Sequence, residues 1–174
     1  MMRHDEQGAL AGISISLVTL TFVAISFTFL SYLKIVLSER ADLELQQEID
    51  SAMRMVDADA MEASICKVYV VEGNSRIAFR KERADESAVG RTRSEASAVT
   101  YALITKNGPP KFCRIRSTVP QPLTGESMFG DVTIVTFQAE ELPSGGIHVV
   151  LEGRSQRTGH TYRQTAIYPL RQKS

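Results

Sequence analysis

Hydrophobic residues follow three successive patterns along this chain. Residues 9–33 contain no charged side chain. A helix of about 25 residues is roughly 38 Å long, enough to cross the ~30 Å hydrocarbon core of a bilayer. Between Leu45 and Ala63, apolar residues recur at spacings of three and four, as in an amphipathic helix. From Cys66 onward the period shortens to two, which is typical of strands.

The first two patterns predict one nearly continuous helix over about residues 9–64, because neither proline nor glycine interrupts residues 13–72. Its first half, 9–37, is predicted to span a membrane. Its second half, 38–65, would bury one face against the rest of the protein and carry acidic residues on its other faces. The apolar stripe of this second half consists of Leu45, Ile49, Ala52, Met53, Val56, Ala60 and Ala63.

The alternating segments predict an antiparallel head domain over 66–174. Two segments without an apolar period, 81–98 and 117–130, are predicted to be loops. Turns of the β-hairpin type are predicted at 73–74, 107–110 and 143–146. The predicted strands are 66–71, 76–80, 98–105, 111–116, 131–140, 146–152 and 161–170. The fold class is α+β: a long N-terminal helix packed on an antiparallel sheet, with the shape of a ladle.

Charge is distributed unevenly between these parts. The chain has 20 basic and 20 acidic residues and a formal net charge of zero, which argues against a general nucleic-acid binder. Residues 35–65 carry two basic and eight acidic side chains, a net charge of −6, whereas 66–174 carry 16 basic and 10 acidic ones, a net charge of +6. An acidic stem therefore precedes a basic head, and this asymmetry can steer how copies or partners dock.

The two cysteines, Cys66 and Cys113, are too few for a zinc site, which needs four clustered ligands. If the head lies outside the cytoplasm, they could form one disulfide that closes a loop of about 48 residues. Loop-closure entropy would credit that bond with on the order of 4 kcal/mol. The alternative is two free, buried thiols.

No catalytic constellation is present. The three histidines lack the spacing of a metal site, and nothing places a base beside Cys113. His148 would point away from the core, because Ile147 and Val149 on the same predicted strand would point into it. Residues 144–146 form a hairpin turn and lack the preceding strand and following helix of a phosphate-binding loop. We therefore predict a protein that is not an enzyme and has no cofactor or metal.

Arginines of the head alternate with aromatic residues, a pattern that also occurs on nucleic-acid-binding surfaces. Arg114 and Arg116 would share a strand face with Phe112, and Arg76 and Arg80 lie on another predicted strand. The interpretation we favour is a solvated face, or salt bridges to the acidic stem of a neighbouring copy. Nucleic acid is therefore not the expected partner.

A short leader that ends in Gly8, an apolar helix that continues as an amphipathic stem, and an antiparallel head together resemble the type IV pilin class. This class comprises pilins, minor pilins and the pseudopilins of type II secretion and competence systems. The resemblance covers most of the chain as a pattern. The order of segments is similar to the J-like or W-like minor-pilin layout over 45–66, 99–101, 112–114, 131–137 and 148–151.

The resemblance implies that a prepilin peptidase cleaves between Gly8 and Ala9 on the cytoplasmic side and removes the leader, 1–8. The new N-terminus is often methylated in this family. The fifth mature residue is usually a glutamate that pairs with a neighbour's terminal amine, whereas this chain has Ile13 there. A tip-located pseudopilin subtype also lacks this glutamate, so the resemblance fits a tip or initiating component, or a chain that is not processed.

The function expected from the resemblance is that of a structural subunit of a type IV pilus, type II secretion or competence filament. It would span the inner (cytoplasmic) membrane once, with the N-terminus in the cytoplasm and the head outside, before extraction into a filament. Its partners would be the lipid bilayer, related subunits bound through the N-terminal helix, and the prepilin peptidase. The alternative is an unprocessed single-pass membrane protein whose extracytoplasmic β domain binds a partner.

Overall fold

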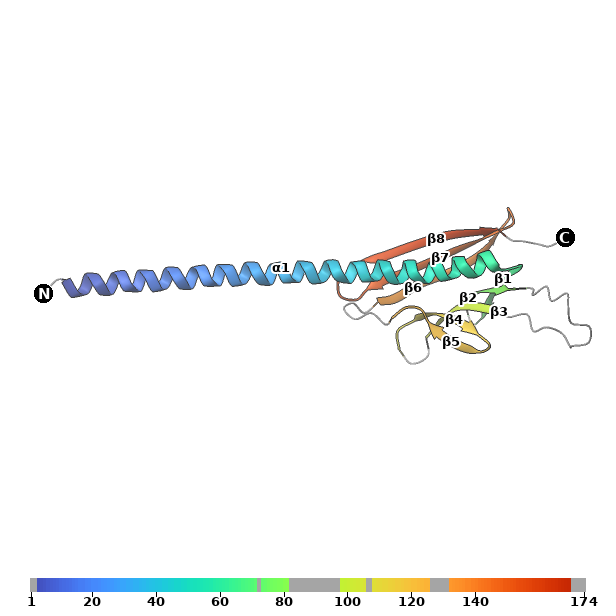
Figure 1. The fold of residues 1–174 in the computed structure, drawn as a ribbon, viewed down its shortest axis with the longest axis horizontal. Coiled ribbons are helices and arrows are strands. Elements are labelled where there is room, and N and C mark those ends of the chain that lie inside the picture. Colours follow the sequence, from blue (N-terminus) through green and yellow to red (C-terminus); the bar gives the residue numbers. More distant parts are fainter. Residues whose placement is uncertain (1–2, 72, 82–97, 106–107, 126–131, 170–174) are drawn as a thin grey trace, which may run out of the picture. The chain divides into compact units, whose positions relative to one another are not determined.

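The chain forms two compact units, Met1–Glu39 and Arg40–Ser174. One helix, α1 (Arg3–Glu62), begins in the first unit and ends in the second (Figure 1). The predicted long helix is therefore confirmed, although it begins before residue 9 and ends at Glu62. In this computed structural model the described residues are 3–71, 73–81, 98–105, 108–125 and 132–169, with side chains of α1 described from Ile15 onward.

The second unit contains a five-stranded antiparallel sheet with the strand order β1-β2-β3-β4-β5. Each strand pairs with the next one along the chain, so consecutive strands are neighbours throughout this sheet. The strands are β1 (Ile65–Val71), β2 (Asn74–Arg80), β3 (Ala98–Ile104), β4 (Lys111–Arg116) and β5 (Val119–Pro122).

A separate three-stranded antiparallel sheet has the order β6-β7-β8. Its register shifts between Ile134 and Thr136, where β6 carries a bulge. The strands are β6 (Val132–Leu142), β7 (Gly146–Ser155) and β8 (Thr161–Pro169). The head therefore has two sheets where a single sheet was predicted, and the α+β class is confirmed.

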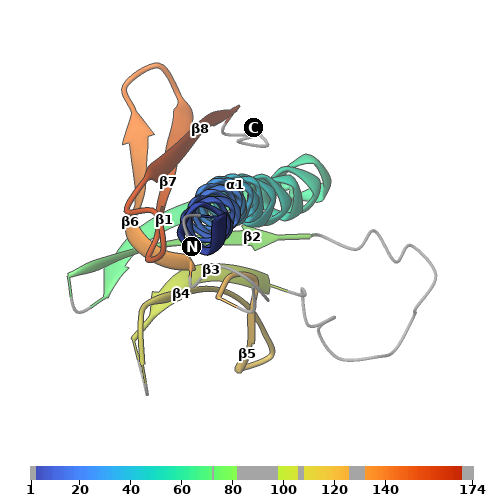
Figure 2. The ribbon, with the colours of Figure 1, turned by 90° about the vertical axis from the view of Figure 1, so that its left-hand side faces the viewer.

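The segment of α1 within the second unit lies between the two sheets (Figure 2). Leu45, Ile49, Met53 and Val56 from the predicted stripe are fully buried and share one core with apolar side chains of both sheets. Aromatic rings in the same core also join the two sheets, because the ring centroid of Phe112 on β4 lies 4.8 Å from that of Phe137 on β6. The helix thus serves as the common packing surface of two sheets that share no hydrogen-bonded ladder.

One predicted loop contains a strand. Residues 117–130 were expected to be irregular, but Val119–Pro122 form β5 and pair with β4. Two prolines weaken the strand signature of this segment, and a proline is tolerated in an edge strand because one side of the strand has no ladder partner. The turn before β5 is also unusual, since Ser117 (φ 47°) and Thr118 (φ 75°) adopt positive φ without glycine. Most of the other predicted loop, 82–97, lies outside the described residues.

Candidate functional site: the surfaces of α1

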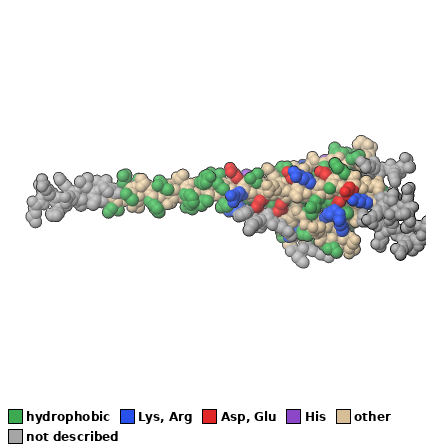
Figure 3. Space-filling view, viewed as in Figure 1, with side chains coloured by type: hydrophobic (Ala, Val, Ile, Leu, Met, Phe, Trp, Pro, Cys, Tyr) green, Lys and Arg blue, Asp and Glu red, His purple; other side chains and the backbone are tan. Residues whose placement is uncertain are grey.

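In the first unit, α1 exposes apolar side chains on all sides. Phe22 and Phe27, for example, are 70% and 73% exposed. Residues 15–33 include no charged side chain, and on the face drawn in Figure 3 hydrophobic side chains recur along this part of the helix among uncharged polar ones. The helix is long and apolar enough to cross a membrane. A helix that is apolar all round needs lipid or other helices around it, so this surface is the first candidate site.

Hydroxyl groups within this apolar surface are satisfied by the helix itself. Thr19 Oγ1 donates to the carbonyl oxygen of Ile15 at 2.8 Å, and Thr28 Oγ1 donates to that of Ala24 at 2.9 Å. Thr21 makes the same kind of backward bond. The polar groups of these residues therefore add little cost in a medium without water.

Gly8 and Ala9, the residues that flank the predicted cleavage site, lie within the bounds of α1. The side chains of α1 are described only from Ile15 onward, which leaves out those of Ala9 and Ile13. Cleavage between them stays a prediction.

In the second unit, five carboxylates of α1 bind groups of the sheets or of the segments next to them. The sequence placed acidic residues on the faces outside the buried stripe and did not predict these contacts. At 100° per residue, these carboxylates form one row on each side of the buried stripe. The groups that bind Asp42, Asp50 and Asp57 belong to β8 and the turn before it. Glu48 and Asp59 bind groups of the five-stranded sheet and the segment after it.

Two tyrosines of β8 donate hydrogen bonds to the first row. Tyr162 Oη donates to Asp50 Oδ1 at 3.1 Å, and Tyr168 Oη donates to Asp57 Oδ1 at 2.5 Å. Burial, together with the hydrogen bond to Asp57, raises the pKa of Tyr168 well above its ordinary value. Both phenols are therefore neutral donors that hold β8 along the helix.

Asp42, near the start of the second unit, binds the turn between β7 and β8. Thr158 Oγ1 donates to Asp42 Oδ1 at 2.6 Å, and His160 Nδ1 lies 2.8 Å from Asp42 Oδ2. The hydrogen bond from Thr158 is the main reason why the pKa of Asp42 lies below its ordinary value. This contact joins the first turns of the α1 segment in this unit to β8.

Asp59 belongs to the second row, with Glu48, and is buried. Arg114 on β4 donates from Nε to Oδ2 at 2.8 Å and from Nη2 to Oδ1 at 2.7 Å, and Tyr101 on β3 donates to Oδ2 at 2.5 Å. Burial opposes ionisation of Asp59, but the bonds from Arg114 and Tyr101 outweigh it and hold the pKa of Asp59 below its ordinary value. The cluster is a satisfied ion pair between helix and sheet.

The predicted basic surface is divided between two faces of the sheet. Arg114 lies on the face toward α1, where its side chain is only 16% exposed and pairs with Asp59. Arg76 pairs in register with Ala102, and Ala102 pairs with Cys113, so these side chains share one face of the sheet. Cys113 directly precedes Arg114 on β4, and successive residues of a strand point to opposite faces, so Arg76 lies on the face away from α1. Arg114 therefore forms a salt bridge with the stem of its own chain, and a salt bridge to the stem of a neighbouring copy stays a prediction.

The sequence left two possibilities for the cysteines, a disulfide or two free thiols, and in the structure both are free thiols. Cys66 is on β1 and Cys113 is on β4, with β2 and β3 between them. Three strand spacings of about 4.8 Å put their Cα atoms at least ~14 Å apart, beyond the reach of a disulfide. Burial, with a smaller effect of Glu141, raises the pKa of Cys66 to about 12, so this thiol is unreactive.

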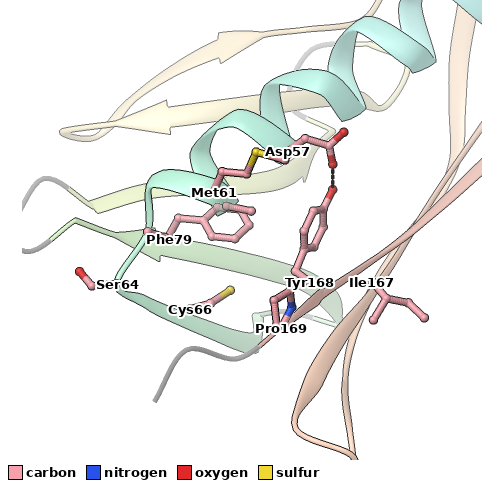
Figure 4. Close-up of a pocket in the computed structure, with 10 residues that line it drawn as sticks. Asp57, Met61, Ser64, Cys66, Phe79, Ile167, Tyr168 and Pro169 are labelled. Carbon is pink, nitrogen blue, oxygen red and sulfur yellow. Dashed lines mark hydrogen bonds between the residues drawn. The ribbon is translucent and has the colours of Figure 1, made fainter. Parts of the chain in front are cut away.

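A pocket of about 420 Å³ opens where α1 ends. Figure 4 shows its walls: Met61 and Asp57 on α1, Phe79 on β2, and Tyr168 on β8, with the Tyr168–Asp57 hydrogen bond at one side. The complete lining is Asp57, Ala60, Met61, Ala63, Ser64, Cys66, Phe79, Ile167, Tyr168 and Pro169. This lining is mainly apolar and suits a hydrophobic side chain better than a polar reactant.

Within the part of the chain that the structure describes, no three histidine, cysteine, aspartate or glutamate side chains gather as a metal site. His148 is half-buried on β7, with Ile147 and Val149 fully buried on either side of it, as the alternation predicted. Among the described residues, the arrangement offers packing surfaces and paired charges.

Gly153 on β7 is a contact residue that the sequence pattern missed. A Cβ atom built there would lie 2.9 Å from Ile49 Cδ1 and 3.0 Å from Leu45 Cδ1, so α1 packs directly on the backbone of β7 at this glycine. An isolated glycine inside a strand is a known sign of close approach, and this was the signal available in the sequence.

Comparison with protein-family models, with curated proteins and with solved structures gives no match for this chain.

Proposed function

We propose that this protein is a minor pilin- or pseudopilin-like structural subunit of a type IV pilus, type II secretion or competence filament, anchored in the membrane before assembly. The observation that carries the proposal is the apolar surface of α1 over 15–33, exposed on all sides of the helix. Outside a bilayer, such a surface is stable only when other helices cover it. We therefore assign it first to lipid and then to a bundle of related helices.

The second unit supports this role. Residues 40–62 of the same helix are held by the core and by five carboxylates, and neither proline nor glycine separates them from the apolar residues. A subunit pulled through its head would therefore transmit force directly to its apolar segment. Sequence-level resemblance to the pilin class adds the expected order of leader, helix and antiparallel head.

The proposed topology is a single pass through the inner (cytoplasmic) membrane, with the N-terminus in the cytoplasm and the head outside. Ile13 replaces the glutamate that usually pairs with the neighbouring subunit, which favours a position at the tip or at the start of assembly. A topmost subunit has no neighbour above it to pair with.

The deciding experiment is the intact mass of the full chain produced with and without a prepilin peptidase. We expect the peptidase to remove residues 1–8, so that the mature protein begins at Ala9. A Gly8→Val variant should keep the leader, whereas Gly12→Val, the matched control, should lose it. The mature chain should then appear in the sheared filament fraction of cells that carry the assembly machine.

A chain that keeps its leader in the presence of the peptidase would overturn the proposal. The second candidate, favoured by the missing glutamate at Ile13, would then hold: an unprocessed single-pass membrane protein whose β domain binds a partner outside the cytoplasm. Membrane extraction with alkaline carbonate would leave this protein in the membrane in both cases, so the mass is the measurement that separates them.

A further inference from the structure

The four edges of the two sheets differ in how they are protected from further pairing. The β5 edge contains two prolines, and β6 has a bulge and donates from the Ile134 amide to the Pro110 carbonyl at 3.4 Å. The short β1 edge carries the exposed Lys67. Prolines, bulges and charged side chains are devices by which proteins block edge pairing. The β5 and β6 edges are therefore blocked by prolines or a bulge, whereas β1 and β8 each carry only one exposed cation in their interior.

The β8 edge has neither a bulge nor a proline in its interior, and its one charged side chain there is Arg163. Its nine residues, Thr161–Pro169, pair with β7 on one side, and no described strand pairs on the other. Proline occurs only at its last position, and the register with β7 is continuous. A row of backbone N–H and C=O groups on such an edge is a template for another strand.

An exposed strip of α1 runs beside this edge. Three residues make up this strip, which we call the α1 strip: Leu43, Arg54 and Met61. Around the helix axis, they lie about 20–60° beyond Asp50 and Asp57, whose carboxylates hold β8. Leu43 is 54% exposed and Met61 is 76% exposed.

The strip and the strand match in length. Leu43 and Met61 are roughly 27 Å apart along the helix, close to the ~27 Å that the nine residues of β8 span. A strand added to β8 would therefore cover the α1 strip from end to end.

We propose that the free edge of β8 and the α1 strip together dock an extended segment of a different protein, which adds as a fourth strand to the β6-β7-β8 sheet. The pocket at the end of α1 receives an apolar side chain of that segment, because Met61, Ile167 and Pro169 lie both at the end of this surface and in the pocket wall (Figure 4). The docking surface lies wholly in the second unit, and only the exclusion of a second copy of this chain rests on the membrane anchor of the proposed function.

The charges favour an acidic residue in the middle of the docked segment. Arg54 is exposed at the centre of the α1 strip and has no salt bridge with any residue in the described ranges. Arg163 does not add to this charge, because it lies on the face of β8 opposite to Tyr162, which contacts α1. A second copy of this chain fits less well. Antiparallel pairing of two β8 edges would set the two α1 helices in opposite directions, because β8 runs along α1 from Asp42 to Asp57 in each copy. Two chains anchored in one membrane by the start of α1 share one direction.

The test uses the full chain in detergent and three labelled peptides with the length of β8, measured by fluorescence anisotropy. The first peptide alternates valine and threonine around a central glutamate, the second has lysine in place of that glutamate, and the third has proline at alternate positions. We expect the first to bind saturably and to slow hydrogen exchange along β8, and the third not to bind. The glutamate peptide should bind about threefold more tightly than the lysine peptide, and Arg54→Glu should reverse this order.

Met61→Asp should weaken binding of the first peptide about tenfold, since it places a charge at the mouth of the pocket. Val135→Asp is the matched control, because Val135 is also an exposed apolar residue of the head, and it should bind like the wild type. Both variants change exposed side chains and should keep the near-UV circular dichroism of the parent.

The proposal would be overturned if the first peptide did not bind saturably or if the proline peptide bound equally well. It would also be overturned if Met61→Asp bound the first peptide as tightly as the wild type, or if that peptide protected β1 from hydrogen exchange instead of β8. A stable dimer in sedimentation that Met61→Asp dissociates would also overturn it, since the occupant would then be a second copy.

Discussion

Arg114 on β4 and Asp59 on α1 form a two-point hydrogen-bonded ion pair, with donor–acceptor distances of 2.8 and 2.7 Å, at the buried junction of helix and sheet. The pair lies 55 residues apart in sequence. Together with Tyr101 it satisfies both oxygens of the carboxylate.

Replacing Asp59 with asparagine should therefore destabilise the fold by about 3 kcal/mol, because the guanidinium of Arg114 would stay buried without a counter-charge. Urea unfolding of the full chain in detergent, followed by tyrosine near-UV circular dichroism, measures this free energy. Glu62→Gln is the matched control, since Glu62 pairs with Lys81 at the surface, and it should change the free energy by less than about 0.5 kcal/mol. Equal losses in both variants would contradict the assignment.

Acid should weaken the same junction. The folded-state pKa of Asp59 lies below its ordinary value of 3.8, despite burial, because Arg114 and Tyr101 bind the carboxylate. A lowered folded-state pKa means that the stabilisation is complete above the unfolded-state value and is lost as pH falls through the folded-state value. We expect the free energy of unfolding to fall below about pH 4. Asp59→Asn should show a shallower fall between pH 5 and pH 3, and an unchanged slope would refute the assignment. The free energy of unfolding of Asp59→Asn should still fall somewhat in acid, because the folded-state pKa of Asp42 also lies below its ordinary value.

The close contact at Gly153 makes a second, independent prediction. Gly153→Ala should destabilise the protein by about 1–3 kcal/mol, because the new methyl group meets Ile49 Cδ1 and Leu45 Cδ1 in a filled core. Ile49→Val removes one of these atoms and should cost about 1 kcal/mol alone. The double variant should be less destabilised than the sum of the two single variants. Strict additivity would show that the helix does not approach β7 at this glycine.

The elements themselves could be predicted because each depends on a local period. The strand predicted at 111–116 coincides with β4, and the stripe from Leu45 to Val56 is the buried face of α1. The division into two sheets could not be predicted, because alternation shows that a strand has two faces and not which strand pairs with it. The same limit explains the cysteines: Cys66 and Cys113 are each on a predicted strand, but only the order of the strands shows that they lie too far apart to bond.

One candidate site could likewise be predicted from the sequence, and another could not. The apolar surface of α1 depends on composition and length alone, so it was predictable. The carboxylates of α1 were predicted to lie on the faces outside the buried stripe, where a charge is normally solvated. Their partners Tyr162, Tyr168 and Arg114 lie more than 50 residues away, and no local period records a tertiary hydrogen bond.

The turn between β4 and β5 should gain stability from glycine. Thr118 has φ 75°, a conformation that costs a β-branched residue about 1–2 kcal/mol. Thr118→Gly should therefore stabilise the protein by about 0.5–1 kcal/mol, after the larger entropy that glycine loses on folding. Gly145→Ala is the reverse case, because Gly145 has φ 82° with nothing within 4 Å of a new Cβ, and it should destabilise by a similar amount. Changes of the same sign in both variants would contradict this explanation of the turn.

Membrane insertion should depend on the apolar side chains of α1 and not on its hydroxyls. Leu20→Arg places a charge near the centre of the exposed apolar surface, where it costs about 3 kcal/mol on an insertion scale, so a larger share of the protein should be extracted by alkaline carbonate. Thr28→Val should leave insertion unchanged or improve it, because the Thr28 hydroxyl already bonds to the Ala24 carbonyl at 2.9 Å and makes no demand on its surroundings. Immunoblots of the extracted and retained fractions measure both effects. If Leu20→Arg stayed fully in the membrane, residues 15–33 would not be in contact with lipid; if Thr28→Val were released, the hydroxyl would have a partner outside its own helix.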